Sequence, residues 1–106
     1  MDILGALRSA ALKRQSVQFE YSAPEKVHGL RVGNPHAGWA NSSTGNLLVH
    51  IMQTEGVSDS GGLPRFGTFK VQHIQNVVVL HDRGPFEPDP KYNRHWSGYA
   101  NALFLI

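Results

Sequence analysis

The chain has 106 residues, of which 41% are hydrophobic and 17% are charged, and its formal net charge at pH 7 is +2. These values are typical of one folded domain with its own core, and the absence of cysteine excludes a disulfide framework and a thiolate metal site. Because the charge is small and the basic residues are scattered, we do not expect tight autonomous binding to duplex DNA.

The sequence shows no signal for a membrane. No apolar stretch approaches the roughly 20 residues that a spanning helix needs. The start lacks the positive segment of a signal peptide, and Arg8 interrupts the first apolar run. We therefore expect a cytoplasmic protein without a membrane partner, in keeping with a chain that has no cysteine.

The chain begins with a pattern that predicts a helix followed by strands. Asp2 can cap a helix that reaches about Gln15. Residues 16–22 then alternate between apolar and polar side chains, which indicates a half-buried strand. A second strand is expected at 27–32, ended by Gly33-Asn34-Pro35, and a loop around Trp39 at 36–45. Further strands are expected at residues 46–53, 66–72 and 74–80.

Five short antiparallel strands favour a mainly β fold with an N-terminal helix, as a strongly bent sheet or small barrel. The connections are too short for the helices of a doubly wound fold. Residues 84–90 are rich in glycine and proline and predict an extended arm. We expect one domain over 1–93 and a C-terminal apolar arm or helix over 94–106, where Trp96 and Tyr99 begin a helical spacing.

The strongest candidate site is the stretch from Gln53 to Lys70, in which a glycine- and serine-rich loop leads into a strand with a cation near each end. Its exposed backbone N–H groups, with Arg65 and Lys70, can complement an anion. These two cations have odd separation, so only one can line a given pocket unless Gly67 forms a bulge. Arg31 lies in the second strand, where its apolar neighbours place it on the polar side, and its guanidinium can grip a phosphate or carboxylate.

Other side chains are weaker candidates, each with an ordinary alternative. Ser58 and Ser60 share parity and could bind a ligand, although such loops are commonly plain connectors. Trp39 could stack on a base or simply cover a small core. Tyr21 is expected in the core with its hydroxyl at the barrel mouth, and His36 follows a turn near Arg31.

The sequence carries no signature of an enzyme or a metal site. The six histidines lack the i, i+4 spacing of a zinc protease, and there is no nucleophile elbow and no phosphate-binding loop with its lysine. We expect a protein that is not an enzyme and has no metal or cofactor.

The order of several short motifs resembles the WYL domain family. The opening helix and residues 17–21 resemble its start, and Arg31 to His36 resembles its arginine–any–any–any–proline–histidine segment. Residues 54–61 resemble the Gly/Ser loop of its short stand-alone members. Residues 65–71, followed by Ile74, resemble a strand of the family in which a bulky residue, a phenylalanine and a cation alternate, and Phe86 with residues 89–93 resembles its tail. The tripeptide that names the family falls on Asn46-Leu47-Leu48, which keeps only the leucine.

The resemblance implies an Sm-like, SH3-type barrel that serves as a non-catalytic sensor in transcription regulation. It also implies that the ligand is a nucleotide, nucleic acid or another anionic effector, bound in a pocket rich in arginine. The 106 residues do not include the helix-turn-helix domain that usually accompanies the module. Two alternatives stay open: an Sm-like binder of single-stranded nucleic acid, and an interaction subunit whose apolar end forms a homodimer or pairs with another protein.

Overall fold

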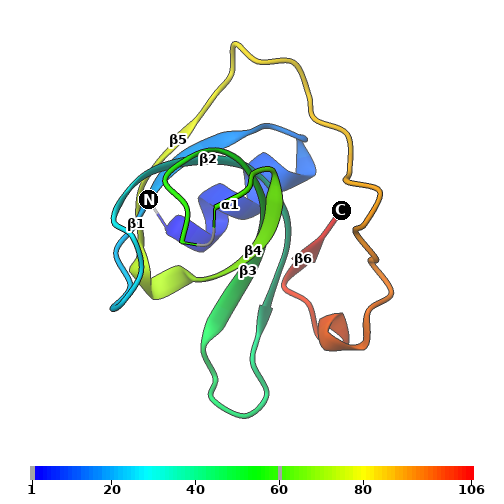
Figure 1. Ribbon diagram of the computed structural model, residues 1–106. Helices are drawn as coiled ribbons and strands as arrows, with labels where there is room; N and C mark the ends of the chain where they lie inside the picture. Colours follow the sequence, from blue (N-terminus) through cyan, green and yellow to red (C-terminus); the bar gives the residue numbers. More distant parts are fainter. Residues whose placement is uncertain (1, 60) are drawn as a thin grey trace.

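The computed structural model describes residues 2–59 and 61–106 of a mainly β protein with one N-terminal α-helix (Figure 1). The strands form an antiparallel sheet in the order β4-β3-β2-β1-β5, and β6 pairs with β2. Within the described residues, no helix has the length and apolar character needed to cross a bilayer. In chain order the elements are α1 (Ile3–Leu12), β1 (Val17–Tyr21), β2 (Gly29–Ala40), β3 (Leu47–Gly56), β4 (Arg65–Lys70), the 3-10 turn η1 (Val71–His73), β5 (Ile74–Val79), the 3-10 turn η2 (Ser97–Tyr99) and β6 (Phe104–Leu105).

Helix α1 begins as the sequence predicts and ends earlier. The Asp2 carboxylate accepts a hydrogen bond from the Gly5 N–H at 2.9 Å, which satisfies one of the free donors of the first turn. The helix ends at Leu12 instead of Gln15, and Lys13 is its C-terminal cap. Its buried residues Leu7, Ala10 and Ala11 pack into the main core.

Strand β1 confirms the predicted alternation. Val17, Phe19 and Tyr21 are buried in the main core, while Gln18 and Glu20 between them are partly exposed. The strand pairs with β2 on one side and with β5 on the other. It therefore lies inside the sheet, with one face against the core.

Strand β2 differs from the prediction, because Gly33-Asn34-Pro35 does not end it. The strand continues to Ala40, so the expected loop over 36–45 was wrong in its first half. The pairing with β3 shifts register between Val32 and Gly33 and again between Pro35 and Ala37. Such irregularities let a proline, which lacks a donor, stay in a strand that bends.

The C-terminal segment closes over its own domain and forms no α-helix. It makes the single turn η2 and then the two-residue strand β6, which pairs with Ala37 and Gly38 of β2. The Leu103 N–H donates to the Gly38 carbonyl at 2.7 Å. Phe104 and Ile106 are buried in the main core. The apolar end is therefore covered by the chain itself.

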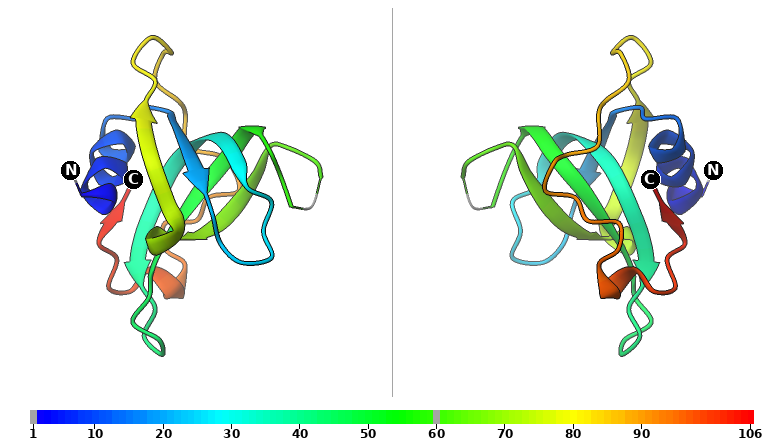
Figure 2. Two further views of the ribbon diagram at one scale, coloured as in Figure 1. Left: turned by 90° about the vertical axis from the view of Figure 1, so that its left-hand side faces the viewer. Right: turned by 90° about the vertical axis from the view of Figure 1, so that its right-hand side faces the viewer.

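The sheet curls without closing. Strand β5 follows β4 after only the turn η1, and it pairs with β1. The last long strand of the chain therefore lies beside the first. No ladder joins β4 to β5 within the described ranges. Figure 2 shows α1 and the C-terminus on one side of the molecule and the loop between β3 and β4 on the opposite side.

Candidate functional site

Arg31 points into the molecule, contrary to the prediction that it faces the polar side. Its side chain is 2% exposed, while its neighbour Leu30 is 51% exposed. The prediction placed Leu30 toward the core and Arg31 toward solvent, and the structure shows the reverse. A buried guanidinium must find partners for its donors, so its surroundings define a polar site inside the sheet.

Three hydrogen bonds hold the Arg31 guanidinium. Nη1 donates to Gln53 Oε1 at 3.2 Å, and Nη2 donates to the Val27 carbonyl at 2.8 Å and to Asp59 Oδ2 at 3.1 Å. Nε is buried and has no hydrogen-bond partner among the described residues. Since a guanidinium carries five donors, the site leaves hydrogen-bonding capacity unused.

Asp59 is fixed as a carboxylate at the edge of the site. It forms an ion pair with Arg31, its side chain is 28% exposed, and it accepts a hydrogen bond from the Val27 N–H at 2.5 Å. The bond from Val27, followed by the hydrogen bond and charge of Arg31, holds the pKa of Asp59 below its ordinary value. These bonds tie the Gly/Ser loop to the start of β2.

Gln53 supports the same loop from β3. Its Oε1 accepts from Arg31, while its Nε2 donates to the Val57 carbonyl at 2.7 Å and to the Glu55 carbonyl at 3.1 Å. Gln53 is a buried polar side chain, and these bonds satisfy both of its amide atoms. The loop therefore leaves β3 in a defined direction.

Two aromatic rings flank the guanidinium. The Arg31 Cζ atom lies 5.6 Å from the ring centroids of both Tyr21 and Phe69, which is within cation–π range. The Tyr21 hydroxyl accepts a hydrogen bond from the Lys70 N–H at 3.0 Å. A Cβ atom at Gly67 would lie 2.5 Å from Phe69 Cε2, so glycine leaves the space that this ring occupies. Gly67 forms no bulge, because β3 and β4 pair in continuous register.

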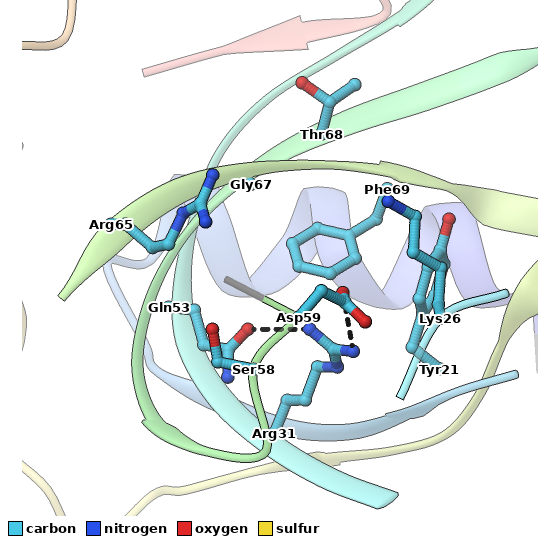
Figure 3. A pocket seen from close by; sticks show the side chains of 10 residues that line it. All are labelled: Tyr21, Lys26, Arg31, Gln53, Ser58, Asp59, Arg65, Gly67, Thr68 and Phe69. Carbon is cyan, nitrogen blue, oxygen red and sulfur yellow. Dashed lines mark hydrogen bonds and ion pairs between the residues drawn. The ribbon is translucent and has the colours of Figure 1, made fainter. Parts of the chain in front are cut away.

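These groups surround a cavity of about 130 Å³ that opens beside the Gly/Ser loop (Figure 3). Three of the lining side chains, Lys26, Arg31 and Arg65, carry positive charge, and Asp59 carries one negative charge. Arg65 and Lys26 form no ion pair within the part of the chain that the structure describes. The cavity is lined by Tyr21, Lys26, Arg31, Gln53, Ser58, Asp59, Arg65, Gly67, Thr68 and Phe69.

The structure brings half of the predicted site residues together. Tyr21, Arg31, Ser58 and Arg65 line the one cavity, although they come from β1, β2, the loop and β4. The remaining predictions fall elsewhere: Lys70 is exposed at the end of β4 and outside the lining, His36 and Trp39 are buried in other places, and Ser60 lies outside the described residues.

His36 is a core residue. Its Nδ1 donates to the Asn34 carbonyl at 2.7 Å, and its Nε2 accepts from the Asp89 N–H at 3.0 Å, which fixes a neutral tautomer. Its ring stacks on Phe86 at 5.3 Å and is fully buried. Burial lowers the pKa of His36 from its ordinary value of 6.5, against opposing effects of the Asn34 bond and the Asp89 charge.

Trp39 belongs to a second, smaller cluster on β2. Its ring is 7% exposed and packs edge-to-face against Tyr99 at 5.4 Å and Trp96 at 5.7 Å. An aromatic side chain that is covered in this way contributes packing and offers no free face to a base. Of its two predicted roles, the structure supports the covering of a small core.

Six of the ten lining residues were not predicted as site residues, and four of these six have polar or charged side chains. Lys26, Gln53, Asp59 and Thr68 reach the cavity from separate elements. Gln53 shares its parity with the buried Val49 and Ile51 of β3, and that parity was the one available signal. Lys26 and Asp59 come from turns whose positions depend on the fold.

The fold and cavity define a small, mainly β domain with a cationic recess at one end of an antiparallel sheet. No protein-family model matches this chain, and no curated protein matches it either. Within residues 2–59 and 61–106, no group of three or more histidine or acidic side chains is placed to hold a metal ion.

Proposed function

We propose that the protein is a non-catalytic binding module for a small anionic ligand, which it holds in the cavity beneath the Gly/Ser loop. The main support for this proposal is the net positive charge of the cavity, whose lining contains three cations, Lys26, Arg31 and Arg65, and one carboxylate, Asp59. Guanidinium and ammonium groups at a partly enclosed site attract phosphate and carboxylate groups strongly.

The size of the cavity favours an anionic head group as the part that enters. At about 130 Å³ it is smaller than the roughly 300–1,000 Å³ of pockets that enclose whole drug-sized ligands. A terminal phosphate or carboxylate would occupy it while the rest of the molecule lies outside, against the exposed Arg65 and the loop. A nucleotide bound through its phosphate fits this description.

A binding role also agrees with the state of the lining groups. Asp59, the carboxylate of the cavity, is held by Arg31 and the Val27 amide and has a lowered pKa, which makes it a poor general base. On this proposal the resemblance to the WYL family extends to function, and the protein senses an anionic effector in a regulatory system.

We further propose that the curled sheet is an open form of the Sm-like, SH3-type barrel that the resemblance implies. Support comes from the three-residue turn η1 between β4 and β5 and from the pairing of β5 with β1, which bring the two ends of the sheet toward each other. The alternative of a single-stranded nucleic-acid binder depended on stacking by Trp39, and that ring is buried. Small anions are therefore the preferred ligands.

The test is a calorimetric titration of pyrophosphate, AMP and citrate into the parent protein and two charge-matched variants. Arg65→Gln removes a cation from the cavity, while Arg8→Gln removes one from α1 on the opposite side of the molecule (Figure 2). We expect at least one anion to bind, Arg65→Gln to weaken it by about five-fold or more, and Arg8→Gln to leave it unchanged. Binding of none of the three, or equal losses in both variants, would overturn the proposal.

A further inference from the structure

A second cavity lies beside Phe66 of β4. Phe66 alternates along the strand with Arg65 and Gly67, which line the first cavity. Thr68 has the parity of Phe66 but lines the first cavity, and its hydroxyl lies 3.0 Å from His50 of the second. The volume of the second cavity is about 260 Å³, twice that of the recess. The residues that line it are His50, Phe66, Lys91, Tyr92, Asn93, Trp96 and Tyr99.

Trp96 is the most exposed ring of this cavity, at 45%. Its position is set by edge-to-face contacts with Tyr99 at 5.0 Å and Trp39 at 5.7 Å. A Cβ atom at residue 98 would lie 2.3 Å from Trp96 Cη2, so Gly98 provides the space in which the indole lies. The surrounding residues therefore keep the large side chain of Trp96 about half exposed at the cavity, although its burial would lower the free energy of the fold.

The polar atoms of His50, Tyr92 and Tyr99 already have partners. His50 Nδ1 lies 2.5 Å from Tyr99 Oη and His50 Nε2 lies 3.0 Å from Thr68 Oγ1, while Tyr92 Oη donates to the Ile106 carbonyl at 3.1 Å. Burial, with a smaller effect of Tyr92, raises the pKa of Tyr99 to about 12, so its hydroxyl stays neutral. The cavity therefore presents mainly ring surfaces to a ligand.

Among the described residues that line the cavity, the one charged side chain, that of Lys91, is positive. The Lys91 ammonium forms no ion pair within the described ranges, and the charge of Arg94 is close enough to act on Tyr92. None of the lining residues is acidic. An ammonium ligand would be attracted by the aromatic rings but repelled by Lys91 and Arg94, whereas an anionic ligand would be attracted by both of these cations.

We propose that this aromatic cavity is a binding site for a planar aromatic carboxylate of about the size of an indole ring with a short acidic arm. The ring lies among Trp96, Phe66 and Tyr92, and the carboxylate reaches Lys91. The site shares no lining residue with the cationic recess, so it stands independently of the function proposed for that recess.

Three ligands that share the indole ring and differ in the charge of their side arm test this site. Indole-3-acetate, indole-3-acetamide and tryptamine are titrated into the ¹⁵N-labelled protein, and the indole Nε1–H signals of Trp39 and Trp96 are followed. We expect indole-3-acetate to shift the Trp96 signal and to bind about five-fold more tightly than the neutral amide, with tryptamine weakest.

Two variants and one control complete the design. Lys91→Gln, at an exposed position, should abolish the preference for the acetate and leave the binding of the amide unchanged; Trp96→Leu should remove binding of all three. Lys13→Gln, at the end of α1, should change nothing. Tightest binding of tryptamine, a charge preference that survives Lys91→Gln, or no shift of the Trp96 signal with any ligand would overturn the proposal.

Discussion

Replacing Asp59 with asparagine tests whether the cavity binds anions or whether the ion pair of Arg31 and Asp59 has only a structural role. The substitution removes the negative charge that faces Arg31 at 3.1 Å, and an asparagine oxygen can still accept from the Val27 N–H. If the cavity binds anions, removal of this carboxylate should strengthen binding. If Arg31 serves only to anchor the loop through Asp59, the substitution should cost stability and change no affinity.

The size of the effect follows from the geometry. An anion that contacts Arg31 beside Asp59 would place two negative charges on the order of 6 Å apart, which costs about 0.7–1.4 kcal/mol at effective dielectric constants of roughly 40–80. Removing the carboxylate should therefore lower the Kd by about three- to ten-fold for each negative charge that the anion brings to this distance. Because the Asp59 side chain is 28% exposed but Arg31 is only 2% exposed, removing the carboxylate leaves a buried guanidinium without its counter-charge, and should destabilise the fold by about 1–3 kcal/mol.

Calorimetric titration with pyrophosphate and urea denaturation measure the two effects on the same samples. Asp82→Asn, an exposed aspartate outside the cavity lining, provides the control for net charge. An unchanged or weaker affinity of Asp59→Asn, with Asp82→Asn behaving as the parent, would refute the placement of the anion beside Arg31.

Three further predictions concern the body of the fold. Burial lowers the pKa of both His36 and His50 from 6.5, so the unfolded chain binds protons before the folded protein does as the pH falls. The free energy of unfolding should therefore decrease below about pH 6.5, by up to ~1.4 kcal/mol per histidine per pH unit. Urea midpoints that stay level from pH 7.5 to 5.5 would contradict this. Gly38→Ala places a Cβ atom 2.4 Å from the Phe104 ring and should cost about 1–3 kcal/mol, whereas an unchanged melting temperature would show that β6 does not pack on β2 as described. Trimming the chain after residue 102 removes β6 and the buried Ile106, and should destabilise the domain without changing its oligomeric state in sedimentation. Release of a smaller, equally stable species would instead support an oligomeric role for this end.

Local periodicity predicted the elements that are governed by one clear pattern. The alternation of Val17, Phe19 and Tyr21 gave β1, and the carboxylate of Asp2 gave the start of α1, because both depend on neighbours in the chain. The Gly/Ser segment and Arg65 also lie together at the cavity as the sequence suggested.

The errors lie where distant contacts override local preference. Strand β2 passes Pro35 because β3 pairs with it through two register shifts, and no residue near Pro35 reveals them. Arg31 turns inward because Gln53 and Asp59 satisfy it from elements that are 22 and 28 residues away. The spacing of Trp96 and Tyr99 suits a helix, but pairing of β6 with β2 holds the end of the chain extended.

The most direct test of the central claim is a map of where pyrophosphate binds. In ¹⁵N-edited spectra, the proposed function predicts shifts at the backbone amides of Ser58, Gly67 and Thr68 and at the Nε–H signals of Arg31 and Arg65, with α1 unaffected on the far side of the molecule (Figure 2). Shifts that avoid these groups, or spectra that do not change at millimolar pyrophosphate, would contradict it.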